Sequence, residues 1–271
     1  MSEHLPSITI TLAVPQASPE QLHDALGDGY TLDEQGLHDP DGRRYEVVAL
    51  PQDHEFADIV VGGATHAPRD EEVAAMRAAP TLLKVTGPGG SLDAAAAMLR
   101  VGAALVETGA AGILCDNSGL GHGGHDWRTL AHDADDGGTH WAFVASNRDH
   151  DGKWTGHDEP VLFTMGMHCL GHREVVVPMT GDDEADWFHL NNTCGYLERS
   201  GRVPVDGDVL TAMAEDEDGT PKVVPMFRVR FEACAHVPPD HPMHNPFGVI
   251  RLEVLDPDDP RSMDWRPSGK A

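Results

Sequence analysis

Alternating apolar and polar residues predict that the chain starts with a β-strand over residues 8–14. Ser18 and Pro19 then supply a cap and a first turn for a short helix, whose apolar face contains Leu22 and Leu26. Turns rich in Gly and Asp separate the segments that follow. The pattern of these segments predicts strands over residues 44–50 and 58–61 and a helix over residues 70–78.

The clearest pattern is a strand, helix, strand unit over residues 81–115. Residues 81–86 form an apolar run that predicts a strand, and the glycine-rich residues 87–90 form a turn. Ser91 can cap the following helix, which Gly109 ends. The apolar residues of this helix recur on one face at Leu92, Ala96, Leu99, Ala103 and Val106. The chain returns as a strand over residues 110–115.

A second unit with the same order lies over residues 173–206. It has a strand over residues 173–178 and a helix that Asp182 or Asp183 can cap. Both units place Thr-Gly before the helix and a hydroxyl residue followed by Gly after it. A duplicated unit explains these shared positions, and so does chance, because Gly and Thr are frequent in turns. The apolar face of the second helix consists of Trp187, Leu190, Cys194 and Leu197, and two further strands are predicted over residues 223–233 and 248–255.

Together these elements predict an α+β fold built from two lobes that each contain a β-α-β unit. We expect mixed or antiparallel sheets with helices packed on one face. The predicted organisation is an N-terminal α+β lobe over residues 1–118, a polar insertion rich in Gly and His over residues 119–139, a C-terminal α+β lobe over residues 140–256, and a loose tail over residues 257–271. A chain of 271 residues can bury one large core or two small ones, so one domain and two domains both remain open.

The net charge limits the choice of partner. Asp and Glu number 45 against 19 Lys and Arg, which gives a formal net charge of -26. Such a field repels phosphate backbones, so we expect no nucleic acid ligand and, if the surface has a partner, a basic protein. No apolar run is long enough to cross a membrane, and the first 14 residues lack the Lys or Arg of a signal peptide. We therefore expect a cytoplasmic protein with no membrane partner.

Several short motifs of the C-terminal lobe occur in a characteristic order: Met165-Gly-Met167, Leu170-Gly171, Arg173-Glu-Val175, Leu190-Asn-Asn-Thr-Cys-Gly-Tyr-Leu197 and Ser200-Gly-Arg-Val-Pro-Val-Asp-Gly-Asp208. With these motifs the lobe resembles a bacterial, uncharacterised family catalogued as domain of unknown function 4261. The resemblance is strongest over residues 162–210, and residues 81–117 are similar to the preceding segment in longer members. That family has no established catalytic residues to transfer, and some members occur in toxin–immunity contexts. The resemblance therefore implies a fold, a bacterial setting and a protein-binding role.

Histidine is unusually frequent, with 17 copies, and neutral imidazole is the commonest metal ligand in proteins. One group, which consists of Cys234, His236, His241 and His244, could close a tetrahedral zinc site, although its spacing matches no zinc finger. A second group, His122 and His125 beside Asp126, could supply metal ligands or an acid/base pair. Structural loops and polar turns are the alternative interpretation of both groups.

Other catalytic signatures are weak. Residues 119–124 fit the G-x-G-x-x-G pattern of dinucleotide sites, but the polar sequence of residues 126–136 does not predict a helix that packs on a sheet. Ser118 lacks the nucleophile elbow, and no cysteine pair forms a C-x-x-C motif. We therefore expect no catalytic residues, no cofactor and four free thiols.

Two functions follow from the sequence. The favoured one is a non-catalytic, cytoplasmic, protein-binding protein, of which an immunity protein is one form. The alternative is a zinc-dependent hydrolase that uses the His and Cys groups. Oligomeric state and the identity of a partner are not encoded in these patterns.

Overall fold

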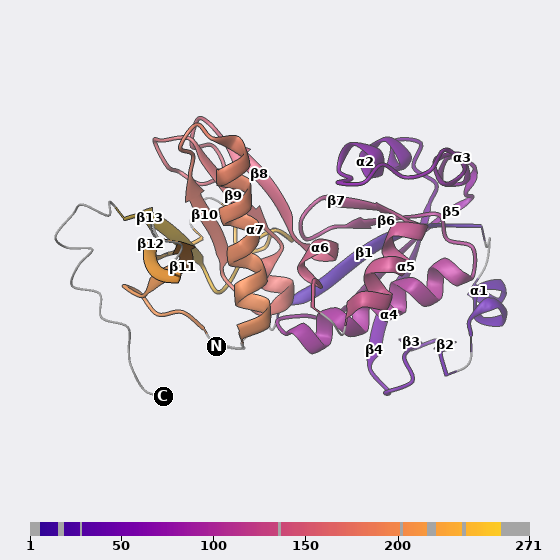
Figure 1. The fold of residues 1–271 in the computed structure, drawn as a ribbon. Helices are drawn as coiled ribbons and strands as arrows, with labels where there is room; N and C mark the ends of the chain where they lie inside the picture. The colour runs from indigo at the N-terminus through magenta and orange to yellow at the C-terminus, as the bar shows by residue number, and fades with distance from the viewer. Residues whose placement is uncertain are drawn as a thin grey trace.

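The computed structural model describes residues 6–15, 19–27, 29–134, 137–200, 203–215, 221–234 and 237–255. Within them the chain forms two lobes, each built around a sheet, that lie side by side (Figure 1). Both sheets are antiparallel or mixed, so the predicted α+β class is confirmed. Among the described helices, none is both long and apolar enough to cross a membrane.

The N-terminal sheet has seven strands in the order β2-β3-β4-β5-β1-β6-β7, and every neighbouring pair is antiparallel. Strand β1 lies between β5 and β6, and residues on both of its faces are buried, including Thr9 and Thr11. The strands are β1 (Ser7–Val14), β2 (Thr31–Asp33), β3 (Gly36–His38), β4 (Arg44–Pro51), β5 (Thr81–Pro88), β6 (Gly112–Cys115) and β7 (Leu120–Gly123).

Helices lie on both sides of this sheet (Figure 1), so the expectation of helices packed on one face is wrong for the N-terminal lobe. The main core forms where α4 (Leu92–Glu107) and α5 (Gly124–Asp133) cover the face that carries Ile8, Ile10 and Leu12. As predicted, the Ser91 side chain caps α4 by accepting a hydrogen bond from the Ala94 N–H at 3.1 Å. The short helices α2 (Phe56–Gly62) and α3 (Asp70–Ala78) cover part of the opposite face, and α1 (Pro19–Ala25) lies beside β2.

The C-terminal sheet has six strands in the order β11-β12-β13-β10-β9-β8. Only β10 and β13 run parallel, because the chain makes a long connection through the helix α7 (Asp183–Ser200) and the β11–β12 hairpin between them. Leu190, Cys194 and Leu197 of α7 are buried, as the spacing of apolar residues predicts. The strands are β8 (Ala145–Asp149), β9 (Val161–Met165), β10 (Glu174–Pro178), β11 (Val209–Glu215), β12 (Pro221–Glu232) and β13 (Val249–Val254).

The two lobes meet at a short 3-10 helix, η2 (Met167–Leu170), and at α6 (His140–Phe143). Gly166 and Gly171 flank η2 with φ angles of 109° and 84°, a region that favours glycine. A Cβ atom on Gly166 would collide with the carbonyl oxygen of Phe143, and one on Gly171 with that of Gly90. One hydrophobic cluster runs from β1 and α4 through η2 to β10 and α7, so the lobes share a core.

The first strand, helix, strand unit is present as predicted. In the second unit the returning strand was expected by residue 206, but residues 203–206 form no strand and β11 begins at Val209. The topologies of the two units also differ. In the first, β5 and β6 are parallel and have one strand, β1, between them. In the second, β10 and β11 are parallel and have β13 and β12 between them. The Thr-Gly and hydroxyl-Gly positions that the two units share therefore do not correspond to the same arrangement of strands.

The strand predicted over residues 58–61 is wrong, because these residues lie within helix α2. Phe56, Ala57 and Val60 of α2 share one buried face against Met76 and Leu82, and helical spacing is what brings these side chains together.

The segment predicted as a polar insertion, residues 119–139, adds β7 to the sheet and contributes α5. Trp127 of α5 is fully buried, and its indole N–H donates to the Leu99 carbonyl at 3.0 Å. The division of the chain into domains stays a prediction, and the tail over residues 257–271 lies outside the described residues.

Candidate functional site

A cleft lies under the hairpin of β2 and β3, next to β4. The Asp33 carboxylate accepts a hydrogen bond from the Gln35 N–H at 2.7 Å, which shapes the hairpin turn. Gly36 has a φ angle of 128°, and a Cβ atom there would collide with the Tyr45 carbonyl oxygen. The Arg44 side chain donates to the carbonyl of Gln35 and fastens the hairpin tip to β4. These contacts hold the hairpin at a fixed distance from the sheet.

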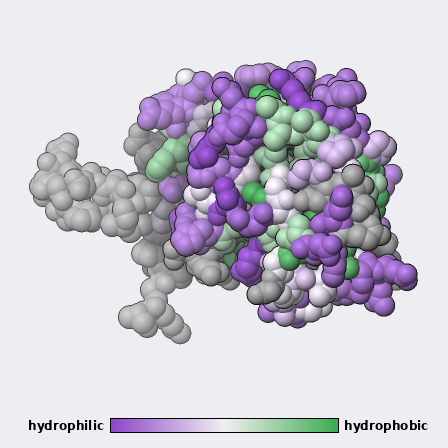
Figure 2. All heavy atoms as spheres, turned by 90° about the vertical axis from the view of Figure 1, so that its right-hand side faces the viewer, coloured by the Kyte–Doolittle hydropathy of each residue, from purple (hydrophilic) through white to green (hydrophobic). Residues whose placement is uncertain are grey.

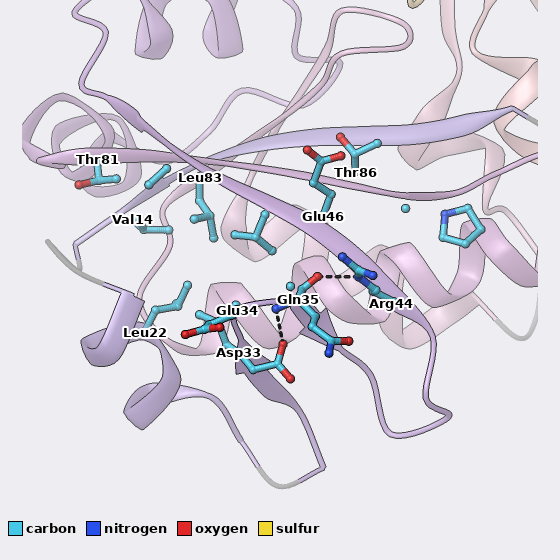
Figure 3. Close-up of a pocket in the computed structure, with 16 residues that line it drawn as sticks. Val14, Leu22, Asp33, Glu34, Gln35, Arg44, Glu46, Thr81, Leu83 and Thr86 are labelled. Carbon is cyan, nitrogen blue, oxygen red and sulfur yellow. Dashed lines mark hydrogen bonds between the residues drawn. The ribbon is translucent and has the colours of Figure 1, made fainter.

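The cleft has a volume of about 620 Å³. Its floor is apolar and its rim is polar, an arrangement typical of binding sites. Figure 3 shows Asp33, Glu34 and Gln35 of the hairpin across the cleft from Thr81 and Leu83 of the sheet. The floor consists of Val14, Leu22, Leu32, Val47, Ala49 and Leu83, and the rim of Asp33, Glu34, Gln35, Arg44, Glu46, Thr81 and Thr86.

The edge of β4 borders this cleft and is largely unpaired. Strand β3 pairs only with Arg44 and Tyr45 of β4. From Glu46 to Pro51, β5 is the only partner strand of β4 within the described part of the chain. Since alternate residues of a strand direct their N–H and C=O groups to opposite sides, this stretch presents backbone donors and acceptors away from β5. Most residues of the stretch are exposed.

Negative charge dominates the rim. Asp33, Glu34 and Glu46 line the cleft with one cation, Arg44, whose guanidinium already donates to the hairpin. The Glu46 side chain extends from the face of β4 opposite Val47 and Ala49, beside Thr86 (Figure 3). The hydrogen bond from the Gln35 N–H lowers the pKa of Asp33, so this carboxyl is ionised at neutral pH. Glu34 and Glu46 are exposed and have no ion-pair partner among the described residues. In Figure 2, hydrophilic residues cover most of the face drawn, with hydrophobic ones in small patches.

The first predicted metal pair, His122 and His125, is held in other interactions. His122 is buried, with Nδ1 at 2.8 Å from Asp126 Oδ2 and Nε2 at 3.0 Å from the carbonyl oxygen of Ala142. Both ring nitrogens of His122 are therefore already in contact with acceptor groups of the protein. His125 is exposed, and its backbone N–H donates to Glu72.

Asp126 also meets the exposed imidazole of His66 at 3.4 Å. The hydrogen bond from His122 is the main cause that lowers the Asp126 pKa, against the opposing effect of burial. The His122–Asp126 pair therefore fastens β7 to α5.

The second predicted group is only partly brought together. Cys234 and His244 line one hollow of about 470 Å³, whereas His241 is not among its lining residues. His244 Nδ1 donates to the Val237 carbonyl at 2.8 Å, and His241 Nδ1 accepts from the Met243 N–H at 3.2 Å. His236 lies outside the described residues.

Within the described residues, no three His, Cys, Asp or Glu side chains converge as a metal site would require. The zinc site stays a prediction. Cys234 also borders a cavity of about 50 Å³ with His157, whose Nε2 lies 3.3 Å from Glu232. That volume suits one or two water molecules and is too small for a substrate.

A buried polar network that the sequence did not suggest lies where the lobes meet. Glu174 accepts hydrogen bonds from the Thr164 hydroxyl at 2.7 Å and from the Asn245 amide at 2.9 Å. His168 Nδ1 lies 3.4 Å from Glu174, and its Nε2 lies 3.1 Å from the side-chain amide of Asn117. The arrangement of Glu174 and His168 resembles a catalytic carboxylate–imidazole pair, but the side-chain amide of Asn117 occupies the position that a nucleophile would take. The network therefore joins the lobes.

Cysteine chemistry is equally constrained. Cys115, Cys169 and Cys194 are buried and unpaired, as expected for free thiols in a core. Burial raises the pKa of each of these thiols far above its usual value, so none is a thiolate at neutral pH. Cys234 is the one described thiol that is partly exposed.

Packing explains the G-x-G-x-x-G pattern of residues 119–124. The helix α5 does begin at Gly124, contrary to the expectation that the following residues are too polar for one. However, Gly121 and Gly123 lie inside strand β7 and not in a loop between a strand and a helix. A Cβ atom on Gly121 would collide with the Val60 carbonyl, and one on Gly123 with the Glu72 carboxylate. These two glycines therefore allow α2 and α3 to approach the sheet.

The residues that form the cleft were not predicted from the sequence. Two local signals could have indicated it: the polar turn of residues 33–36 between Leu32 and Leu37 marks a hairpin, and residues 46–51 have the composition of a strand. Neither signal shows that the two segments leave a cleft between them.

Comparisons with known proteins add no family or neighbour. No protein family, no curated protein and no solved structure matches this chain. The resemblance to domain of unknown function 4261 therefore stays a prediction. A proposal for the function has to rest on the geometry of the sites described above.

Proposed function

We propose that this chain is a binding protein whose cleft beside β4 takes a segment of a basic protein partner. The observation that carries the proposal is the cleft of about 620 Å³ with its apolar floor and acidic rim. An apolar floor stabilises a complex by removing side chains from water, while a charged rim selects the partner.

The charge of the whole molecule favours the same kind of partner. A formal net charge of -26 attracts a basic protein over distances set by the ionic strength. Glu34 and Glu46 place exposed, uncompensated carboxylates beside the cleft. Binding through such a site should be fast and should weaken as salt is added.

Competing chemical functions find less support. His122 and His168 are buried with both ring nitrogens in protein contacts, and neither lines the cleft. His140 is also buried and outside the cleft lining, with Nδ1 in contact with Glu198. A protein that binds without reaction needs no such group in its cleft. An immunity function is one form that this binding could take in a cell.

A peptide library tests the proposal. Ten-residue random peptides displayed on phage are selected on the immobilised wild-type protein, and the recovered peptides are measured by fluorescence anisotropy. We expect peptides rich in Lys and Arg whose affinity falls with salt. The double variant Glu34→Gln, Glu46→Gln should weaken them about fivefold, because each exposed charge pair contributes about 0.5 kcal/mol.

The control removes the same charge elsewhere. Glu71 in α3 and Glu184 in α7 are exposed, so the variant Glu71→Gln, Glu184→Gln also changes the net charge by two. It should bind the recovered peptides as the wild type does. The proposal is wrong if no peptide is recovered, or if both double variants weaken binding equally.

A further inference from the structure

The free edge of β4 is unusual for a soluble protein. Between Glu46 and Pro51 its sequence is apolar, Val47-Val-Ala-Leu50, and contains no Lys. Proteins normally protect edge strands with Lys, a bulge or a covering segment, because an open apolar edge pairs with other chains. Here Val48 is 41% exposed, and among the described residues no segment pairs with the outer side of this stretch.

The opposite end of the same sheet shows how this protein covers an edge. Beside β7, the Gly121 N–H donates to the Gly63 carbonyl at 3.1 Å, and Ala64 forms a parallel bridge with Gly121. The end of α2 thus shields that edge. The contrast indicates that the open stretch of β4 is available for a partner.

The two faces of β4 next to the edge differ in chemistry. Val47 and Ala49 point to the apolar floor, while Glu46 pairs in register with Thr86 on the other face. A strand placed against this edge would alternate its side chains between the two faces. Apolar residues would reach the floor near Leu83, and basic residues between them would lie near Glu46.

We infer that the partner segment binds as an additional β-strand along residues 46–51, with apolar and basic residues in alternation. This inference rests on the proposed function and adds its binding mode. Six residues of β4 span about 20 Å, so about six residues of the partner pair with it. A second copy of this chain is disfavoured as the occupant, because two molecules of charge -26 repel each other.

N-methylation of the peptide tests the binding mode. Each peptide recovered from the library is synthesised with a methyl group on one backbone nitrogen at a time. In an added strand, every second N–H donates to β4 and the others point away. Methylation should therefore weaken binding at least tenfold at alternate positions and less than twofold at the positions between them.

Amide hydrogen exchange of the protein supplies the second measurement. On saturation with peptide, exchange should slow at alternate residues of Glu46–Leu50, whose outward amides are open without a partner. The variant Val47→Lys, which puts a charge over the floor, should weaken the peptides at least tenfold. The matched variant Val254→Lys, at a 55% exposed strand residue of the other lobe, should not.

The outcomes separate this inference from the proposed function. Peptides that lose affinity with Glu34→Gln, Glu46→Gln but show no alternation on methylation would overturn strand addition and leave the cleft as a binding site. Protection confined to the hairpin residues 33–36 would overturn it in the same way. Failure to recover any peptide would overturn both.

Discussion

The buried ion pair between α6 and α7 permits a quantitative prediction. His140 Nδ1 lies 2.5 Å from the Glu198 carboxylate, which also accepts hydrogen bonds from the N–H groups of Gly138 at 3.0 Å and Thr139 at 2.7 Å. The side chain of Glu198 is only 4% exposed. The perturbation is Glu198→Gln, which keeps the shape of the side chain and an acceptor for the backbone but removes the charge.

The magnitude follows from the pKa of Glu198. Burial opposes ionisation, but the hydrogen bonds from His140 and Thr139 outweigh it and lower the pKa from 4.5 to about 2. Each pKa unit corresponds to about 1.4 kcal/mol, so the ionised carboxylate contributes about 3 kcal/mol to the free energy of unfolding at pH 7. Since the pKa is lower in the folded state, this contribution is complete above pH 4.5 and is lost as the pH falls towards 2.

The assay is guanidinium unfolding followed by circular dichroism. At pH 7, Glu198→Gln should lower the free energy of unfolding by about 3 kcal/mol, and the difference from the wild type should shrink below pH 4.5. The control is Glu107→Gln, which breaks an exposed ion pair with Arg128 of 3.1 Å and should cost less than about 1 kcal/mol. Equal losses for both variants, or a difference that is constant with pH, would refute the reasoning.

Three further predictions follow from other contacts. Gly102→Ala should lower the free energy of unfolding by about 1–3 kcal/mol although Ala favours helices, because the added Cβ would lie 2.5 Å from the Trp127 indole nitrogen. The control Gly62→Ala, whose Cβ would have nothing within 4 Å, should not lower it, and thermal melts of the two variants test the difference. Asp126→Asn should cost about 1 kcal/mol at neutral pH by weakening the contact with His122, and the cost should disappear in acid as the lowered carboxyl pKa is crossed, which unfolding at several pH values would measure. Elemental analysis of untagged protein should find less than about a tenth of an equivalent of zinc, and close to one equivalent would instead favour the metal-dependent alternative.

Local sequence signals predict much of the fold. The cap at Ser91 and the one-face spacing after it define α4, and the alternation of residues 8–14 defines β1. The error at residues 58–61 arose because a short apolar run fits a strand and a buried helix equally well. The packing against Met76 that decides between them is formed by a different segment of the chain.

The candidate site depends on contacts that local patterns do not contain. The cleft exists because β3 pairs with only two residues of β4, a matter of register between segments. The frequency of histidine suggested metal ligands, but His122 meets Ala142 and His140 meets Glu198, residues 20 and 58 positions away. Sequence spacing alone cannot show that such a partner already occupies an imidazole nitrogen.

The glycine-flanked helix η2 limits how this protein can be engineered. Gly171 brings the backbone of one lobe against Gly90 of the other, and the two lobes share one hydrophobic cluster. A cut between the lobes would therefore expose buried apolar side chains on each half. Neither half should be transferable to another scaffold as a ready-made module. A minimal binder made from β1 to β7 alone would need its newly bared apolar side chains redesigned before it stayed in solution.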